Sequence, residues 1–209
     1  MKIAVVCANG KAGKLIVEEA LRRGHDVTAV VRGENRSAAE KALVKDLFDL
    51  TAEDLAGFDV VVDAFGAWTP ETLHQHSESL AHLCDILSGT QTRLLVVGGA
   101  GSLYVNPEHT AVVSDGPDFP DAFKPLAAAQ GKELAELRQR SDVRWTFVSP
   151  AADFQAEGER TGKYLLAGEE LTLNDRGESV ISYADYAIAM VDEAEKGEHV
   201  GQRISVARA

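Results

Sequence analysis

Short apolar runs alternate along the chain with segments whose apolar residues recur at helical spacing. The apolar runs predict buried strands at 3–7, 27–31, 59–64, 93–97 and 145–148. Helical spacing predicts helices over 12–23, 37–43, 69–87, 123–140 and 183–195. Gly24 fits the end of the first helix, and Thr69 before Pro70 fits the start of the third. Short strands are expected again at 43–45 and 202–206.

Repeated strand–helix–strand units predict a mostly parallel sheet with helices on both faces, a doubly wound α/β fold. Beyond residue 158 the pattern changes to short strand candidates at 163–167, 170–174 and 178–181, separated by glycine-containing turns. This stretch has too little apolar sequence to form a core of its own. We therefore expect a single domain over residues 1–209, with residues 151–182 as a small appendage.

A glycine-rich loop joins the first strand to the first helix. It contains Ala8, Asn9, Gly10, Lys11, Ala12 and Gly13. In this context Gly10 would let the backbone approach a pyrophosphate, Gly13 would let the helix pack closely on the sheet, and the first helical N–H groups would bind phosphate. The loop therefore predicts a Rossmann dinucleotide site. A glycine turn without a ligand is the alternative, whereas a P-loop is excluded because only two residues separate Gly10 from Gly13.

The end of the second strand indicates which dinucleotide binds. Asp or Glu there usually holds a ribose 2′-hydroxyl, whereas Arg suits a 2′-phosphate. This strand ends at Arg32, with Arg36 shortly after it and Lys11 in the glycine loop. The three cations favour NADP(H), while Glu34 leaves NAD(H) open. The alternative for Arg32 is an ordinary solvated charge.

Composition and charge narrow the class of protein. A 209-residue chain with 45% hydrophobic residues and no apolar run of membrane-spanning length is typical of a soluble globular domain. Two widely spaced cysteines suggest a cytoplasmic location. The net charge of −12 argues against nucleic acid and membrane partners, but residues 1–45 hold nine Lys and Arg against five Asp and Glu. That basic start suits a small polyanionic ligand. We expect no metal site, because His74, His76, His82 and Cys84 do not share one helix face.

Five stretches, "ANGKAG", "VVVDAFGAW", "RLLVVGGAGSL", "WTFVSPAADF" and "VISYADYAIAMVDE", span nearly the whole chain. On them the sequence resembles the atypical short-chain dehydrogenase/reductase proteins, within them the NADH-flavin reductase group related to NmrA-like proteins. The resemblance implies adenine contacts at Asp46 and Leu47. It further implies contacts along the ribose and pyrophosphate at Ala64, Phe65 and Gly66, and near the nicotinamide at Gly98, Gly99, Ser149, Pro150 and Lys132.

Many such relatives use a Tyr proton donor with Lys four residues later, and this chain lacks the pair. None of its four tyrosines has Lys at that spacing, and the expected helix places Ala128 and Lys132 there. We therefore predict no catalytic acid among the side chains. Hydride transfer to a flavin or a similar conjugated molecule tolerates that loss, since charge spreads through the ring system and solvent supplies the proton. Flavin would then be a small-molecule substrate, not a bound cofactor.

Aromatic residues that follow the strands are candidates for the substrate pocket. We expect contacts from Trp68, Ser102, Tyr104, Phe123 and Phe154, with Phe65 beside them, Phe119 and Phe123 as a lid, and the 151–182 appendage on the substrate side. Each aromatic could equally be a core residue. One alternative function is a non-catalytic NADP(H) sensor of NmrA-like type. A more distant one is a nucleotide-sugar or isoprenoid enzyme that uses Asp153 as its acid. The sequence leaves the oligomeric state open.

Overall fold

The computed structural model describes all residues 1–209 and centres on an eight-stranded sheet in the order β3-β2-β1-β4-β5-β6-β10-β8. The sheet strands are β1 (Lys2–Val6), β2 (Asp26–Val31), β3 (Lys41–Val44), β4 (Val60–Asp63), β5 (Arg93–Val97), β6 (Arg144–Ser149), β8 (Tyr164–Ala167) and β10 (Gln202–Arg208). Every neighbouring pair is parallel except β8 and β10. The prediction of a mostly parallel, doubly wound Rossmann-like sheet is confirmed.

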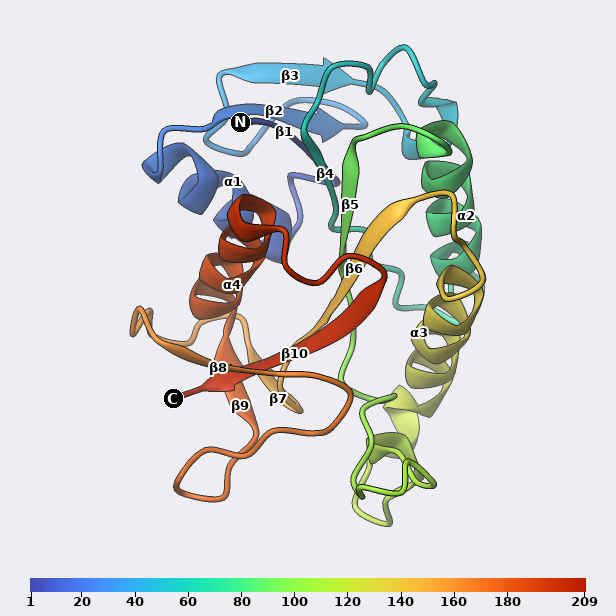
Figure 1. Ribbon diagram of the computed structural model, residues 1–209, viewed down its shortest axis with the longest axis vertical. Helices are drawn as coiled ribbons and strands as arrows, with labels where there is room; N and C mark the ends of the chain where they lie inside the picture. Colours follow the sequence, from blue (N-terminus) through green and yellow to red (C-terminus); the bar gives the residue numbers. More distant parts are fainter.

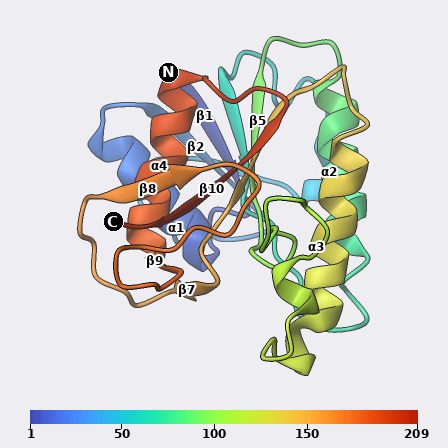
Figure 2. The same ribbon diagram turned by 60° about the horizontal axis from the view of Figure 1, so that its bottom comes forward.

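Two helices cover each face of this sheet. Figure 1 shows α1 (Lys11–Arg22) beside α4 (Tyr183–Lys196) on one side, with α2 (Gln75–Leu87) and α3 (Lys124–Leu137) on the other. The turned view in Figure 2 separates the same two layers. Because the central strands are enclosed on both faces, their side chains form two separate apolar cores, and β4 is buried along its whole length. No helix is both long and apolar enough to cross a membrane.

The region after β6 differs most from the sequence prediction. A strand at 163–167 is present as β8, but 170–174 is not a strand and contributes only an isolated bridge from Glu170 to Tyr104. An unpredicted strand, β7 (Asp153–Gln155), pairs in parallel with β9 (Val180–Ser182) in a small second sheet. Three residues are too few for a period-two pattern to be recognised in sequence.

The predicted helix at 37–43 is wrong. The Asn35 side chain accepts hydrogen bonds from both the backbone N–H and the hydroxyl of Ser37, and it donates to the Ala39 carbonyl. These local bonds compete with helix formation. The chain bends there and enters β3 instead, where Lys41 pairs with Thr28 of β2.

The long helix predicted from Thr69 begins later, at Gln75. Before it the chain forms tight turns, in which the Gln75 N–H donates to the Thr72 carbonyl and the His76 N–H to the Leu73 carbonyl. Such bonds between residues three apart are tighter than those of an α-helix. The six residues from 69 to 74 therefore belong to the β4–α2 connection.

Candidate functional site

A cleft of about 1740 Å³ opens at the carboxyl ends of the parallel strands. Pockets for single small ligands are usually roughly 300–1,000 Å³, so this cleft has room for more than one. Ligands of open α/β sheets bind at this edge. A second hollow of about 690 Å³, near Met1 and Arg144, lies at the opposite ends of the strands. We therefore place the functional site in the larger cleft.

The cleft contains most of the residues expected from the sequence. Its wall includes Asn9, Gly10, Lys11, Ala12, Arg32, Arg36, Asp46, Leu47, Ala64, Phe65, Gly66, Trp68, Gly98, Gly99, Phe119, Phe123, Pro150 and Phe154. These residues follow β1, β2, β3, β4, β5 and β6. The parallel order of the strands brings them together although they are distant in sequence.

The turn between β1 and α1 is tightly built. A Cβ on Gly13 would lie 2.7 Å from the Cys7 carbonyl oxygen, so any larger residue would push α1 away from β1. Gly13 and Ala8 are buried and lie beneath the cleft wall, not on it. No side chain caps the start of α1, and its first turn holds no acidic residue. The N–H groups at this helix end are thus left for an anion.

Asn9 joins this turn to the loop after β2. Its amide nitrogen donates to the Glu34 carbonyl at 2.9 Å, and its amide oxygen accepts the Arg36 N–H at 2.7 Å. The sequence prediction assigned Asn9 to the cofactor directly. In the structure its polar atoms hold the loop that carries Arg32 and Arg36.

At the end of the cleft near β2 and β3, cationic side chains outnumber the carboxylates of Glu34 and Asp46. Lys11, Arg32 and Arg36 line it, and none forms an ion pair within the chain. Lys45 is different, because it binds Asp54 at 2.6 Å. The Asp46 carboxylate accepts the Phe48 N–H and so fixes the turn after β3. Free cations in a confined groove attract a polyanion.

Two expected nicotinamide contacts lie away from the cleft. Lys132 is 69% exposed and lies 3.5 Å from Glu136 on the outer side of α3. Ser149 is fully buried, and its hydroxyl has no hydrogen-bond partner. The α3 side chains that line the cleft are Leu126, Ala127 and Gln130. Leu126 and Gln130 are four residues apart, so the cleft-facing register lies two residues before the predicted one.

Gln130 is a cleft residue that the sequence analysis missed. Its side-chain oxygen would lie 2.1 Å from a Cβ on Gly99, so the amide rests directly on the glycine pair after β5. Gln130 is not a titratable group. Where many relatives place a Lys four residues after a Tyr, the cleft-facing pair of α3 is Leu126 and Gln130, so a neutral amide lies at the cleft wall.

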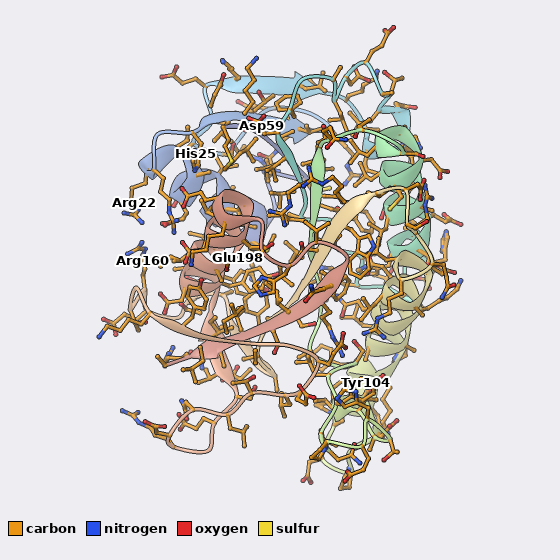
Figure 3. All side chains as sticks on the ribbon, viewed as in Figure 1. Arg22, His25, Asp59, Tyr104, Arg160 and Glu198 are labelled. Atoms are coloured by element: carbon orange, nitrogen blue, oxygen red, sulfur yellow. The ribbon has the colours of Figure 1, made fainter.

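Ser102 and Tyr104 also lie outside the cleft wall. The carbonyl and hydroxyl oxygens of Ser102 both accept hydrogen bonds from Arg203. The Tyr104 ring stacks on His109 at 4.2 Å, with the Arg203 guanidinium 5.6 Å from its centre. Figure 3 shows Tyr104 at the lower end of the molecule, in the loop after β5. Both residues anchor that loop to β10.

The other end of the cleft is aromatic. The Phe154 ring stacks on Tyr183 at 3.8 Å and contacts Tyr186 at 4.8 Å. Trp68 and Phe123 lie on the cleft wall with 68% and 51% of their surfaces exposed. The Tyr183 hydroxyl makes no hydrogen bond within the chain, and burial raises the pKa of this phenol. This end presents flat apolar surface with one free hydroxyl.

A buried acidic group lies beside the cleft, and no motif or spacing in the sequence predicts it. Asp63, His76 and Glu133 come from β4, α2 and α3 and are 2%, 2% and 3% exposed. Burial raises the pKa of Asp63 to about 6 and that of Glu133 to about 7. Burial would lower the pKa of His76, but its bond to Glu133 and the nearby carboxylate charges raise it. Only tertiary structure brings the three residues together.

Comparison with known proteins assigns the chain to a family. Residues 7–195 match the family described as NAD(P)H-binding. The chain belongs to this NAD(P)H-binding family. The match covers the glycine loop and continues through α4, so a nicotinamide dinucleotide is the ligand of this fold.

Individual relatives extend over the whole chain. The crystal structure of SP1627 from Streptococcus pneumoniae TIGR4, provisionally assigned as an NADH-flavin reductase, is 59% identical, superposes with a TM-score of 0.98 and is covered completely by this chain. The uncharacterized protein YwnB of Bacillus subtilis (strain 168) is 47% identical over 99% of this chain and 98% of its own length. A 3-diazoavenalumate denitrifying reductase of a Streptomyces species is 28% identical over 96% of this chain and 74% of its own length.

Proposed function

We propose that this chain is a reductase that uses NADPH to reduce a flat, conjugated small molecule such as a flavin. The chain is an NAD(P)H-dependent oxidoreductase, as its family and its reductase relatives indicate. The observation that carries the finer proposal is the contrast between the two ends of one cleft, one cationic and one aromatic.

The cationic end suits the 2′-phosphate of NADP(H). Arg32 and Arg36 line the cleft without a carboxylate partner, and Asn9 holds their loop against the start of α1. Arg binds phosphate through two parallel N–H bonds, which a ribose hydroxyl cannot use fully. The uncapped N–H groups of α1 would hold the pyrophosphate. These groups fit the cofactor without displacing any internal ion pair.

The aromatic end suits a planar acceptor. When bound, the reduced nicotinamide supplies a hydride. Phe154 and Tyr183 on one side, with Trp68 and Phe123 on another, would align an acceptor ring by stacking. Neither Leu126 nor Gln130 offers a titratable proton at the wall of α3. An acceptor that spreads charge over a ring system and takes its proton from solvent fits that wall better than a simple ketone.

Mixing the protein with NADPH or NADH and with FMN, FAD or a quinone tests the proposal. We expect loss of reduced-nicotinamide absorbance with at least one of these acceptors, and faster turnover with NADPH at low cofactor concentration. Tight NADPH binding with no turnover of any acceptor would favour the sensor function instead. Turnover of simple ketones but not of conjugated acceptors would also contradict the proposal.

A further inference from the structure

The Asp63–His76–Glu133 group differs from the buried glutamates Glu19 and Glu193 of the α1–α4 layer. Buried Glu19 binds Arg22 and Arg23, and buried Glu193 binds Arg93. The Asp63–His76–Glu133 group contains no Lys or Arg. One carboxylate oxygen of Asp63 has no hydrogen-bond partner, and one of Glu133 has only the long 3.5 Å contact with the His76 ring. Buried carboxylates without partners are costly, so their retention beside the cleft calls for an explanation.

The His76 ring makes contacts that depend on its charge. Its Nε2 lies 3.1 Å from the Ala67 carbonyl oxygen and 3.3 Å from the Ala67 nitrogen. Its Nδ1 lies 3.5 Å from the free oxygen of Glu133. An imidazolium has two N–H groups and can donate to Glu133 and to the Ala67 carbonyl together. A neutral ring protonated at Nδ1 keeps the Glu133 contact, and its Nε2 then accepts the Ala67 N–H.

Ala67 lies in the segment that carries two aromatic residues of the cleft wall. Phe65 and Gly66 precede it, Trp68 follows it, and all three line the cleft. Asp63 accepts the Phe65 N–H at 3.0 Å, and the Phe65 ring meets the His76 ring edge-on at 5.5 Å. Both ends of the Phe65–Trp68 segment are therefore attached to the buried group.

The proton content of this group changes near neutral pH. Two ionised carboxylates without a cation would leave a buried charge of −2, so a proton is held among the three side chains. The pKa of Asp63 is about 6 and that of Glu133 about 7, both raised by burial. Glu136 acts on Glu133 from the same helix. Cys7 and Cys84 lie near Asp63 but stay neutral, because burial raises the pKa of each thiol to about 12.

We propose that His76 is a positioning residue for the acceptor. Its protonation state selects the carbonyl or the amide of Ala67 and thereby sets where the Phe65–Trp68 segment lies on the cleft wall. Glu133 and Asp63 hold the proton that makes the selection. The inference rests on the proposed function, since Phe65 and Trp68 matter here as part of the acceptor surface.

The fluorescence of Trp68 tests this directly, without cofactor or acceptor. The other tryptophan is Trp145. The Trp68→Phe variant gives the Trp145 signal alone, which is subtracted from that of the wild-type protein. We expect the Trp68 signal of the wild-type protein to titrate between about pH 5 and 8. In His76→Gln, which keeps one donor but cannot titrate, the transition should disappear. In Glu133→Gln it should move to lower pH by about one unit or more, because the charge that favours the imidazolium is gone.

A matched control lies two residues away. His74 is 58% exposed and pairs only with Glu78, so His74→Gln should leave the transition unchanged. A wild-type signal that does not titrate would overturn the proposal, and so would an unchanged midpoint in Glu133→Gln. Glu133→Gln keeps the test decisive if His76→Gln does not fold.

Kinetics separate this proposal from the proposed function. With an active acceptor, the KM for that acceptor should change with pH through the same midpoint while the Kd for NADPH does not. A pH-independent acceptor KM in the wild-type protein would contradict the role of His76. Absence of all turnover would contradict the proposed reductase instead, while the Trp68 titration would still report on the buried group.

Discussion

Two regions of the molecule differ in how their charged side chains are paired. One is the layer formed by α1 and α4, and the other is the cleft at the carboxyl ends of the strands. Beside α1, buried Glu19 binds Arg22, Arg23 and Arg160. The Arg160 bond joins the segment before β8 to the first helix. Figure 3 shows Arg22 and Arg160 side by side at this edge. Deeper in the layer, Arg93 donates to Glu193 and to Thr146.

The cleft leaves several charges and one hydroxyl without a partner in the chain. Lys11, Arg32 and Arg36 on its wall pair with no carboxylate, and beside it Asp63 and Glu133 have His76 as their neighbour but no Lys or Arg. The tyrosines repeat the contrast. Tyr164 donates to Asp192 and Tyr186 to the Val148 carbonyl, whereas the Tyr183 hydroxyl is free in the cleft. Partnered groups stabilise the fold, and unpartnered ones mark where a ligand or a proton is expected.

The largest effect should come from breaking a partnered charge. Arg93→Met would leave buried Glu193 with His199 as its one ionic partner, so we expect the free energy of unfolding to fall by about 3–5 kcal/mol in urea titrations. Arg144, paired with Arg93 in the sheet register, is exposed. Arg144→Met should cost less than about 0.5 kcal/mol. Equal losses in both variants would show that pairing in this layer contributes nothing special.

Removing the buried carboxylate of Glu133 should raise the free energy of unfolding, the opposite of the effect of Arg93→Met. The pKa of Glu133 is about 7 in the folded chain and roughly 4.3 when unfolded, so ionisation opposes folding increasingly as the pH rises through this window. Glu133→Gln should therefore match the wild-type stability near pH 4 and exceed it by about 3–4 kcal/mol above pH 7.5. Glu136→Gln, on the exposed side of α3, should show a much smaller pH dependence, because Glu136 is the last of the causes that raise the pKa of Glu133. Urea titrations across this pH range measure both.

The free cations should matter for binding more than for stability. Arg32→Glu should weaken NADPH binding about 10–100-fold and leave NADH binding nearly unchanged, because a bond to a charged phosphate contributes about 1.5–3 kcal/mol. Fluorescence titration with the two cofactors measures the difference. Arg176→Glu makes the same charge change at an exposed position outside the cleft. If Arg32→Glu weakened the binding of NADPH and NADH equally, Arg32 would not be the residue that binds the 2′-phosphate.

The free hydroxyl should have the smallest effect. If solvent supplies the proton, Tyr183→Phe keeps the stack on Phe154 and should change kcat less than about threefold. A general acid is worth about 10²–10⁴-fold, so a loss of that size would make Tyr183 the proton donor. Tyr164→Phe, outside the cleft, serves as the control for loss of a phenol.

Pattern alone predicted the layers of this fold, because buried parallel strands and amphipathic helices have distinct periods. It failed where side chains compete with the backbone, as Asn35 does before β3. It also failed where a strand is only three residues long, as in β7.

The site was predictable where it depends on local sequence. The glycine loop and Arg32 follow directly from strand and helix boundaries. Which side of α3 lines the cleft was not predictable from the sequence. Packing of Glu133, Leu134 and Leu137 sets the rotation of the helix. That rotation places Gln130 at the cleft and Lys132 in solvent. The buried group of Asp63, His76 and Glu133 joins three distant segments, each of which is unremarkable in sequence.

The two hydrogen bonds of Asn9 bear on any attempt to redesign cofactor preference. They connect the pyrophosphate loop to the backbone of Glu34 and Arg36, so the two loops behave as one mechanical unit. Exchanging residues 32–36 for an acidic NADH-type loop would also shift the glycine turn unless the new loop presents the same carbonyl and N–H to Asn9. The choice between NADPH and NADH and the position of the pyrophosphate loop are therefore coupled. A loop exchange that succeeds has to preserve both hydrogen bonds of Asn9.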